Sequence, residues 1–128
     1  MSYHITTFPN EPIILLSVSE DYDIQRDLTY SNKDVIAHLE RAPEPVFYVN
    51  DLSKLDLDFE SLMYAANYLC LGETSTYNHP KVRQVLFVGG NEMMLMAAEG
   101  IQTETFGSVN ARVFGTVDEA LAYACARI

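Results

Sequence analysis

Short apolar runs that alternate with amphipathic segments constrain the fold of this chain more than any other feature of its sequence. Residues 13–18, 45–49 and 82–88 are rich in branched and aromatic side chains with few polar interruptions, as is typical of strands covered on both faces. The segments between them show helical spacing of apolar residues, and strand–helix–strand units place their strands in parallel. The pattern therefore predicts an α/β fold in which helices pack on a mostly parallel sheet.

Two more strands and a last helix complete the predicted order, which is ββαβαβαβα with a five-stranded sheet. The first strand, residues 3–8, alternates polar and apolar side chains and is expected to pair antiparallel with the second. Residues 19–30 are polar and acidic without a clear period, and they are predicted to be mostly loop, with room for a short helical turn. The later elements are expected as helices at 31–42, 58–71 and 92–99, a fifth strand at 111–114, and a helix after the capping box Thr116–Glu119.

Length and composition indicate one globular unit. The chain has 128 residues, of which 48% are hydrophobic and 20% charged, and this composition excludes a disordered or fibrous protein. No apolar run approaches the ~20 residues that span a bilayer, and the first residues lack the basic and apolar regions of a signal peptide. We therefore expect a single domain over residues 1–128, located in the cytoplasm and not in a membrane.

The chain is strongly acidic, with 18 acidic and eight Lys or Arg side chains and a formal net charge of −10. Residues 20–60 hold eleven of the acids and four of the bases. Nucleic acids and anionic membranes attract basic surfaces, so neither is expected as a partner. The acidity either keeps a cytosolic protein soluble or attracts a basic protein partner.

Motifs of catalysis and metal binding are missing from the sequence. Cys70 and Cys125 fall at apolar positions of predicted helices and form no Cys-x-x-Cys pair, so both are expected to be buried, reduced thiols. His4, His38 and His79 lie on different elements without the spacing of metal ligands. With no G-x-S-x-G turn and no Cys–His pairing, the sequence predicts a protein that is not an enzyme and has no cofactor or metal.

The ends of the predicted parallel strands form the one candidate ligand edge. Ligands of open α/β sheets bind outside the carboxyl ends of the strands, where this sequence places Asp51, Gly89, Gly90, Asn91 and Thr116. The Gly89–Gly90 turn matches neither the G-x-G-x-x-G nor the P-loop spacing. A small-molecule domain for a lipid-like ligand or a nucleotide remains the alternative function.

The helix predicted at 58–71 has two distinct faces. Its expected core face consists of Phe59, Leu62, Met63, Ala66, Leu69 and Cys70. The opposite face presents Ser61, Tyr64 and Tyr68 and is flanked by Leu57 and Leu71. Tyr64 and Tyr68 are i, i+4 neighbours, and tyrosine is enriched in protein interfaces. This outer face is a candidate interaction surface, or its tyrosines lie along the surface or under a loop.

The helix predicted at 92–99 is rich in methionine. Met93, Met94 and Met96 share it with leucine and alanine. Core packing against the sheet is the expected role of these side chains. Methionine faces also adapt to irregular partners, which is the alternative role.

Two segments of the sequence carry recognisable motifs. The run Val46-Phe47-Tyr48-Val49-Asn50-Asp51-Leu52-Ser53 is an apolar strand that leads into Asp-Leu-Ser. The ending Val113-Phe114-Gly115-Thr116-Val117-Asp118-Glu119-Ala120-Leu121-Ala122-Tyr123 is a final strand with a cap and Glu-Ala-Leu. Both segments resemble the STAS-like domain family, the fold of anti-sigma-factor antagonists and of sulphate-transporter tails. The likeness covers nearly the whole chain in topology and about twenty residues in motif.

In the antagonists, the resemblance implies a phosphorylatable serine at the start of the second helix, within an Asp-Ser-Ser/Thr-Gly-type motif. This sequence has Phe59-Glu60-Ser61-Leu62 there, so it departs from that motif. Ser61 and Ser53 are the candidate regulatory hydroxyls. The sequence as a whole predicts a non-catalytic regulatory domain that recognises a protein partner, or a second copy of itself, through the second helix and the acidic loop before it.

Overall fold

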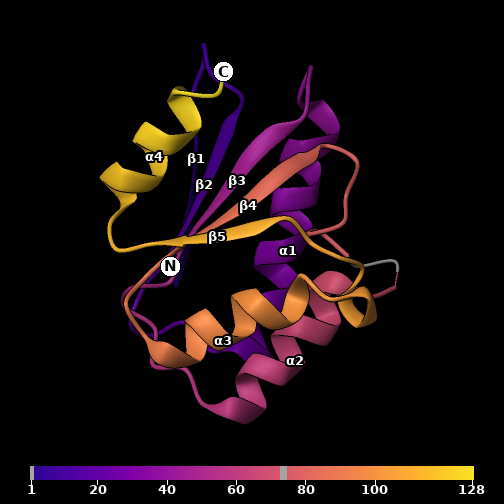
Figure 1. The fold of residues 1–128 in the computed structure, drawn as a ribbon, viewed down its shortest axis with the longest axis vertical. Helices are drawn as coiled ribbons and strands as arrows, with labels where there is room; N and C mark the ends of the chain where they lie inside the picture. Colours follow the sequence, from indigo (N-terminus) through magenta and orange to yellow (C-terminus); the bar gives the residue numbers. More distant parts are fainter. Residues whose placement is uncertain (1, 73–74) are drawn as a thin grey trace.

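The computed structural model describes residues 2–72 and 75–128 and shows one five-stranded sheet (Figure 1). The strand order follows the chain, β1-β2-β3-β4-β5. β1 pairs antiparallel with β2, and the three remaining pairs are parallel. The predicted mostly parallel α/β sheet is therefore confirmed. The strands are β1 (Tyr3–Thr7), β2 (Ile13–Val18), β3 (Val46–Asp51), β4 (Val82–Val88) and β5 (Ala111–Phe114).

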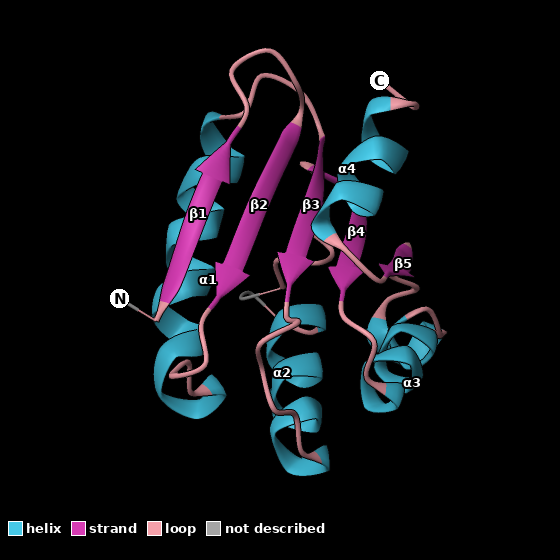
Figure 2. Ribbon diagram, turned by 90° about the vertical axis from the view of Figure 1, so that its left-hand side faces the viewer, coloured by secondary structure: helices cyan, strands magenta, loops and turns pink. Residues whose placement is uncertain are grey.

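Four helices and one short 3₁₀ turn cover this sheet unequally. Because the parallel strands follow one another in space, successive crossovers of the same hand place their helices on one face. That face carries the first three helices, and the last helix lies alone on the other face (Figure 2). The elements are α1 (Ile24–Arg41), α2 (Phe59–Cys70), α3 (Glu92–Ile101), η1 (Glu104–Phe106) and α4 (Val117–Cys125).

Alternation along the strands divides the core into two clusters. Ile14 of β2 points to the larger cluster beneath α1–α3, and its neighbour Ile13 points to the smaller cluster beneath α4. Both side chains are almost fully buried. In the smaller cluster, Ala120 and Ala124 allow α4 to approach β3 and β4 closely. The strands read as continuous apolar runs because both faces are covered.

The predicted loop at 19–30 is wrong from Ile24 onward, because α1 begins there. Asp23 caps the helix by accepting a hydrogen bond from the backbone N–H of Arg26 at 3.1 Å. Ser31 and Asn32, expected to start the helix, are 1% and 3% exposed in its middle. These two polar residues occupy core positions and conceal the helical period in the sequence.

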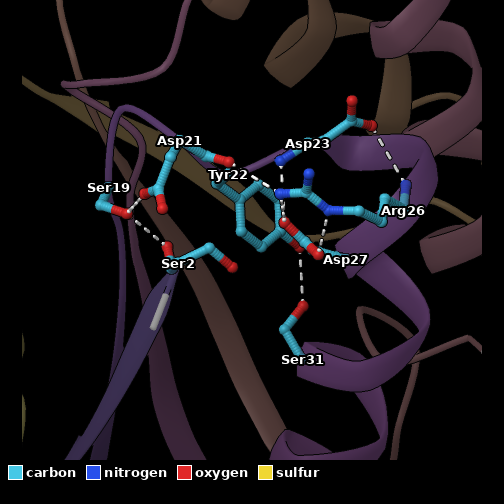
Figure 3. A network of polar contacts seen from close by, with 8 residues as sticks. All are labelled: Ser2, Ser19, Asp21, Tyr22, Asp23, Arg26, Asp27 and Ser31. Atoms are coloured by element: carbon cyan, nitrogen blue, oxygen red, sulfur yellow. Dashed lines mark hydrogen bonds and ion pairs between the residues drawn. The ribbon is translucent and has the colours of Figure 1, made fainter.

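The first turns of α1 are held by a polar network (Figure 3). The Arg26 guanidinium donates to both carboxylate oxygens of Asp27, at 2.9 and 2.8 Å, and holds the pKa of that carboxyl well below its ordinary value. The hydroxyls of Tyr22 and Ser31 share a hydrogen bond of 2.7 Å. Ser31 thereby gains a partner that the sequence pattern does not reveal.

The second helix projects beyond the sheet. After β3 the chain first runs away from the strand ends, so α2 begins at the far tip of the molecule and returns toward the sheet (Figure 2). Leu69 and Cys70 at its carboxyl end are buried, and the helix lies between α1 and α3. Gly72 follows with φ of 77°, the left-handed conformation that suits a residue just after a helix. The predicted stop at Gly72 is confirmed.

Candidate interaction surface

Exposed apolar side chains distinguish α2 from an ordinary surface helix. Phe59 is 63% exposed and Met63 37%, although both were expected on the core face. Leu62 and Ala66, on the same predicted face, are half-buried. The predicted core face is therefore wrong at the amino-terminal half of the helix, because that half extends past the strand ends.

On α2, Ser61, Tyr64, Tyr68 and Leu71 form what we call the tyrosine face, and its Tyr68 also packs against the larger core cluster. The rings of Tyr64 and Tyr68 stack at 6.2 Å between centroids with an interplanar angle of 17°. Tyr64 and Leu71 are 38% and 41% exposed, and Tyr68 and Ser61 are half-buried. The face offers stacked aromatic area with polar tips.

Leu57 does not belong to this face. Its side chain is 8% exposed and packs in the larger core cluster. Its expected position on the exposed surface is therefore wrong. The residue precedes the helix cap Asp58 and points inward before α2 begins.

A second apolar surface, which the sequence analysis did not predict, lies between α2 and α3. We call it the α2–α3 groove. It has a volume of about 130 Å³ and is lined by Phe59, Leu62, Met63, Ala66, Met93, Met96, Ala97, Gly100, Ile101 and Phe106. Met96 is 65% exposed, whereas Met94 is 3% exposed. The expected core packing of the methionines holds for Met94 and not for Met96.

The charges around these surfaces have one sign. Residues 55–72 contain Asp56, Asp58 and Glu60, and residues 91–108 contain Glu92, Glu99 and Glu104; neither segment contains a Lys, Arg or His. All six carboxylates belong to exposed residues. Within these two segments the apolar surface is therefore surrounded by acidic side chains alone, and the nearest base along the chain is Lys54, in the loop just before residue 55.

The candidate regulatory serines both lie against carboxylates. The backbone N–H of Ser61 donates to Asp58 at 2.7 Å, and this bond together with the Ser61 hydroxyl lowers the pKa of Asp58. The Ser53 hydroxyl donates to Asp51 at 2.7 Å. A phosphate on either serine would meet a carboxylate at close range, which opposes its addition.

The predicted ligand edge is assembled, but its side chains are used in turns and caps. Sheet register places Asp51 beside Val88, and Gly89 donates its N–H to Phe114 at 2.9 Å. Asn91 and Thr116 cap α3 and α4 by accepting from backbone N–H groups.

Backbone conformation favours glycine at the first position of the Gly89–Gly90 turn. Gly89 has a φ of 155°, which other residues rarely adopt, and an added Cβ would lie 2.7 Å from the terminal methyl of the flexible Met94 side chain. Gly90 is exposed, and Glu92 follows in the first turn of α3. The negative charge of Glu92 disfavours a phosphate at this helix start.

An apolar cavity of about 80 Å³ lies behind that edge, between the sheet and α1–α3. Its lining includes Leu57, Leu62 and Ala65, with Asn50 and Tyr77 among its few polar side chains. The Tyr77 hydroxyl donates to the Asn50 side-chain oxygen at 2.8 Å. Burial raises the pKa of Tyr77 well above its ordinary value. The cavity can hold a small apolar group without leaving this hydrogen bond unmade.

The two thiols differ in environment. Cys70 is buried as predicted, and burial raises its pKa to about 11. The predicted burial of Cys125 is wrong: it ends α4, is exposed, and its thiol donates to Glu11 at 3.1 Å. That bond raises the pKa of the Cys125 thiol.

Metal-binding clusters and membrane-spanning helices are both absent from the part of the chain that the structure describes. Among residues 2–72 and 75–128, no three His, Cys, Asp or Glu side chains are grouped as a metal ion requires. In the same ranges, no helix has the length and apolar character to cross a bilayer.

Comparison with known proteins identifies the fold. No protein family and no curated protein matches the sequence. The crystal structure of an uncharacterised DUF3478-family protein with a SpoIIAA-like fold, from Shewanella loihica PV-4, superposes with a TM-score of 0.58 at 12% identity. That of an anti-sigma factor antagonist from Mycobacterium paratuberculosis superposes with a TM-score of 0.53 at 21% identity. In each comparison the match covers 96% of this chain and 92% of the other. The predicted STAS-like fold is confirmed.

Proposed function

We propose that this protein with a STAS-like fold is a non-catalytic regulatory domain that binds a protein partner through α2 and the acidic loop before it. The observation that carries the proposal is the exposure of large apolar and aromatic side chains along α2. Phe59, Met63 and Tyr64 are each more than a third exposed. Large apolar side chains gathered on the surface of one element are a mark of interaction sites.

Two further features support this surface. The stacked Tyr64 and Tyr68 rings are rigid and amphipathic, as interface side chains commonly are. The loop before α2 adds the exposed carboxylates of Asp56 and Asp58, which favour a partner with basic side chains. The similarity in fold to an anti-sigma factor antagonist is consistent with a regulatory role.

The test compares the tyrosine face with a more exposed tyrosine on another helix. Tyr64→Ala/Tyr68→Ala is the test variant, and Tyr30→Ala on α1, where Tyr30 is 65% exposed, is the matched control. Each protein is used for affinity capture from the source cells and for size-exclusion chromatography. A captured protein is then purified, and its Kd for each variant is measured.

We expect the double variant to weaken binding of the purified partner at least about tenfold, the effect of losing one interface anchor, and the control to leave it unchanged. If the partner is a second copy, the double variant elutes as a smaller species than the unmodified protein. Equal binding and equal elution of all three proteins would remove this face from consideration.

A second candidate function is binding of a small apolar or lipid-like ligand, and the cavity behind the strand ends favours it. We would measure the thermal midpoint of the protein with indole, medium-chain fatty acids and nucleotides. A specific ligand raises the midpoint by mass action, and Ala65→Leu, which fills the cavity from its wall, should abolish that rise. No rise with any compound, or an equal rise in the filled variant, contradicts this candidate.

A further inference from the structure

The α2–α3 groove and the tyrosine face are different surfaces of the same helix. Phe59 and Met63 line the groove, whereas Tyr64 and Tyr68 do not. A partner that covers only the tyrosine face therefore leaves the groove open. We propose that the groove binds one amphipathic α-helix of a partner protein, with an apolar face flanked by Lys and Arg residues. This inference rests on the proposed function and assigns the partner's chemistry.

The dimensions of the groove suit a short helix. The groove is lined by residues 59–66 of α2 and 93–101 of α3, which at about 1.5 Å per residue form walls about 12 and 14 Å long. Two to three turns of a partner helix match that length and present apolar side chains at i, i+3, i+4 and i+7. The ten lining residues supply an apolar floor and walls for them.

The walls can adapt to such a partner. Met63, Met93 and Met96 lie along the groove, and unbranched thioether side chains repack around irregular apolar shapes. Phe59 and Met96 are each more than 60% exposed, so covering them removes substantial apolar area from water. Phe59 and Met96 therefore contribute little to the stability of the fold, and they become buried only when a partner occupies the groove.

The charge around the groove selects the kind of helix. Glu60 follows Phe59 on α2, Glu92 and Glu99 lie on α3, and Glu104 precedes Phe106. Within the segments 55–72 and 91–108 no basic side chain offsets these carboxylates. A helix with Lys and Arg beside its apolar face meets opposite charge, whereas an acidic helix or an anionic membrane is repelled.

The test uses peptides of about 18 residues and the full chain. One peptide has a leucine face flanked by lysines; a second has glutamates in place of the lysines; a third has the lysine composition with its leucines scrambled off one face. Calorimetry measures each Kd, and phosphatidylserine vesicles serve as the membrane probe. We expect the lysine peptide to bind at least about tenfold more tightly than either other peptide and less tightly as salt rises, with no binding to vesicles.

Adjacent residues of α3 provide the matched variants. Met96→Ser removes an exposed side chain that lines the groove, and Leu95→Ser removes one that is 48% exposed and does not line it. We expect Met96→Ser, and independently Phe59→Ser, to weaken the lysine peptide at least about tenfold, and Leu95→Ser to leave its Kd unchanged. Circular dichroism confirms that each variant is folded.

Several results would overturn the inference: equal Kd values for the lysine and glutamate peptides, equal losses in Met96→Ser and Leu95→Ser, or binding to vesicles. If the peptide fails while partner binding still depends on Tyr64 and Tyr68, this inference falls and the proposed function stands. If both fail, the proposed function falls as well.

Discussion

The crossover helices α1 and α2 have similar places in the chain and opposite relations to the core. α1 buries an apolar stripe from Ile24 in its first turn to Leu39 in its last, and among its residues Tyr30 is the one large apolar side chain that is exposed. α2 buries Leu69 and Cys70 at one end and exposes Phe59 at the other. The helix beside the sheet buries apolar residues along its whole length, whereas the helix that projects past the sheet leaves some of them exposed.

Their amino termini differ in the same way. Asp23 caps α1 within a network that joins Arg26 and Asp27 to the preceding loop (Figure 3). At the start of α2, Asp58 accepts the Ser61 N–H, and the side chains that follow face solvent or the groove. The amino terminus of α1 is held by hydrogen bonds to the preceding loop, whereas the amino terminus of α2 is exposed.

The largest effect is expected from truncation of the α1 stripe. Leu39 is fully buried, so Leu39→Ala should lower the free energy of unfolding by about 2–5 kcal/mol. Phe59→Ala on α2 should lower it by less than about 0.5 kcal/mol. Urea unfolding measures both, and similar losses would contradict the contrast between the helices.

A smaller effect is expected from the buried polar pair of α1. Tyr22→Phe removes the hydroxyl that bonds to Ser31 and should lower the free energy of unfolding by about 1 kcal/mol. Tyr30→Phe, on the exposed side of α1, is the control and should have no effect. No loss in Tyr22→Phe would mean that the pair does not support the helix start.

The buried Tyr22–Ser31 pair also predicts that the free energy of unfolding depends on pH. Burial raises the pKa of Tyr22 to about 12, above about 10 for an unfolded tyrosine. Because the folded-state pKa is the higher one, the neutral phenol stabilises the fold below about pH 10, and this contribution is lost as the pH rises through about 12. Ultraviolet titration of tyrosinate should show a late component that shrinks in Tyr22→Phe, and an unchanged late component would refute the assignment.

The smallest effect is expected from chemical labelling of the two thiols, which reports whether the carboxyl end of α2 stays packed in the native protein. Cys70 is buried with a pKa of about 11, whereas Cys125 is exposed. A disulfide reagent at neutral pH should modify one thiol of the native protein at Cys125 and reach Cys70 after unfolding. Cys70→Ser should leave the native reaction intact. Rapid labelling of Cys70 in the native state would show that α2 separates from the sheet.

The sheet could be predicted from the sequence because its strands are unbroken apolar runs between helical segments. The start of α1 could not, because Ser31 and Asn32 occupy core positions and their partners depend on tertiary packing: Asn32 bonds to Thr76, 44 residues away. Polar residues in a buried stripe erase the period that pattern analysis uses.

For the candidate site, the sequence predicts the angle of each α2 side chain around the helix axis, but not how far along the axis the side chain lies from the sheet. Helical spacing placed Tyr64 and Tyr68 next to each other, and their rings stack, although Tyr68 also packs against the larger core cluster. The same spacing assigned Phe59 and Met63 to the core, because a helical wheel gives the angle of a side chain around the axis and not its distance along the axis from the sheet. The α2–α3 groove could not be predicted without knowing where α3 packs against α2. The methionines of α3 were the one feature of the sequence that pointed to an exposed apolar surface there.

The most direct test of the central claim is photo-crosslinking in the source cells with a benzophenone amino acid in place of Tyr64 on α2 or Tyr30 on α1. Both positions are accessible, so they differ in the helix that they report. The account predicts a discrete protein adduct from position 64 that is absent from position 30. The same adducts from both positions, or none from position 64, would contradict it.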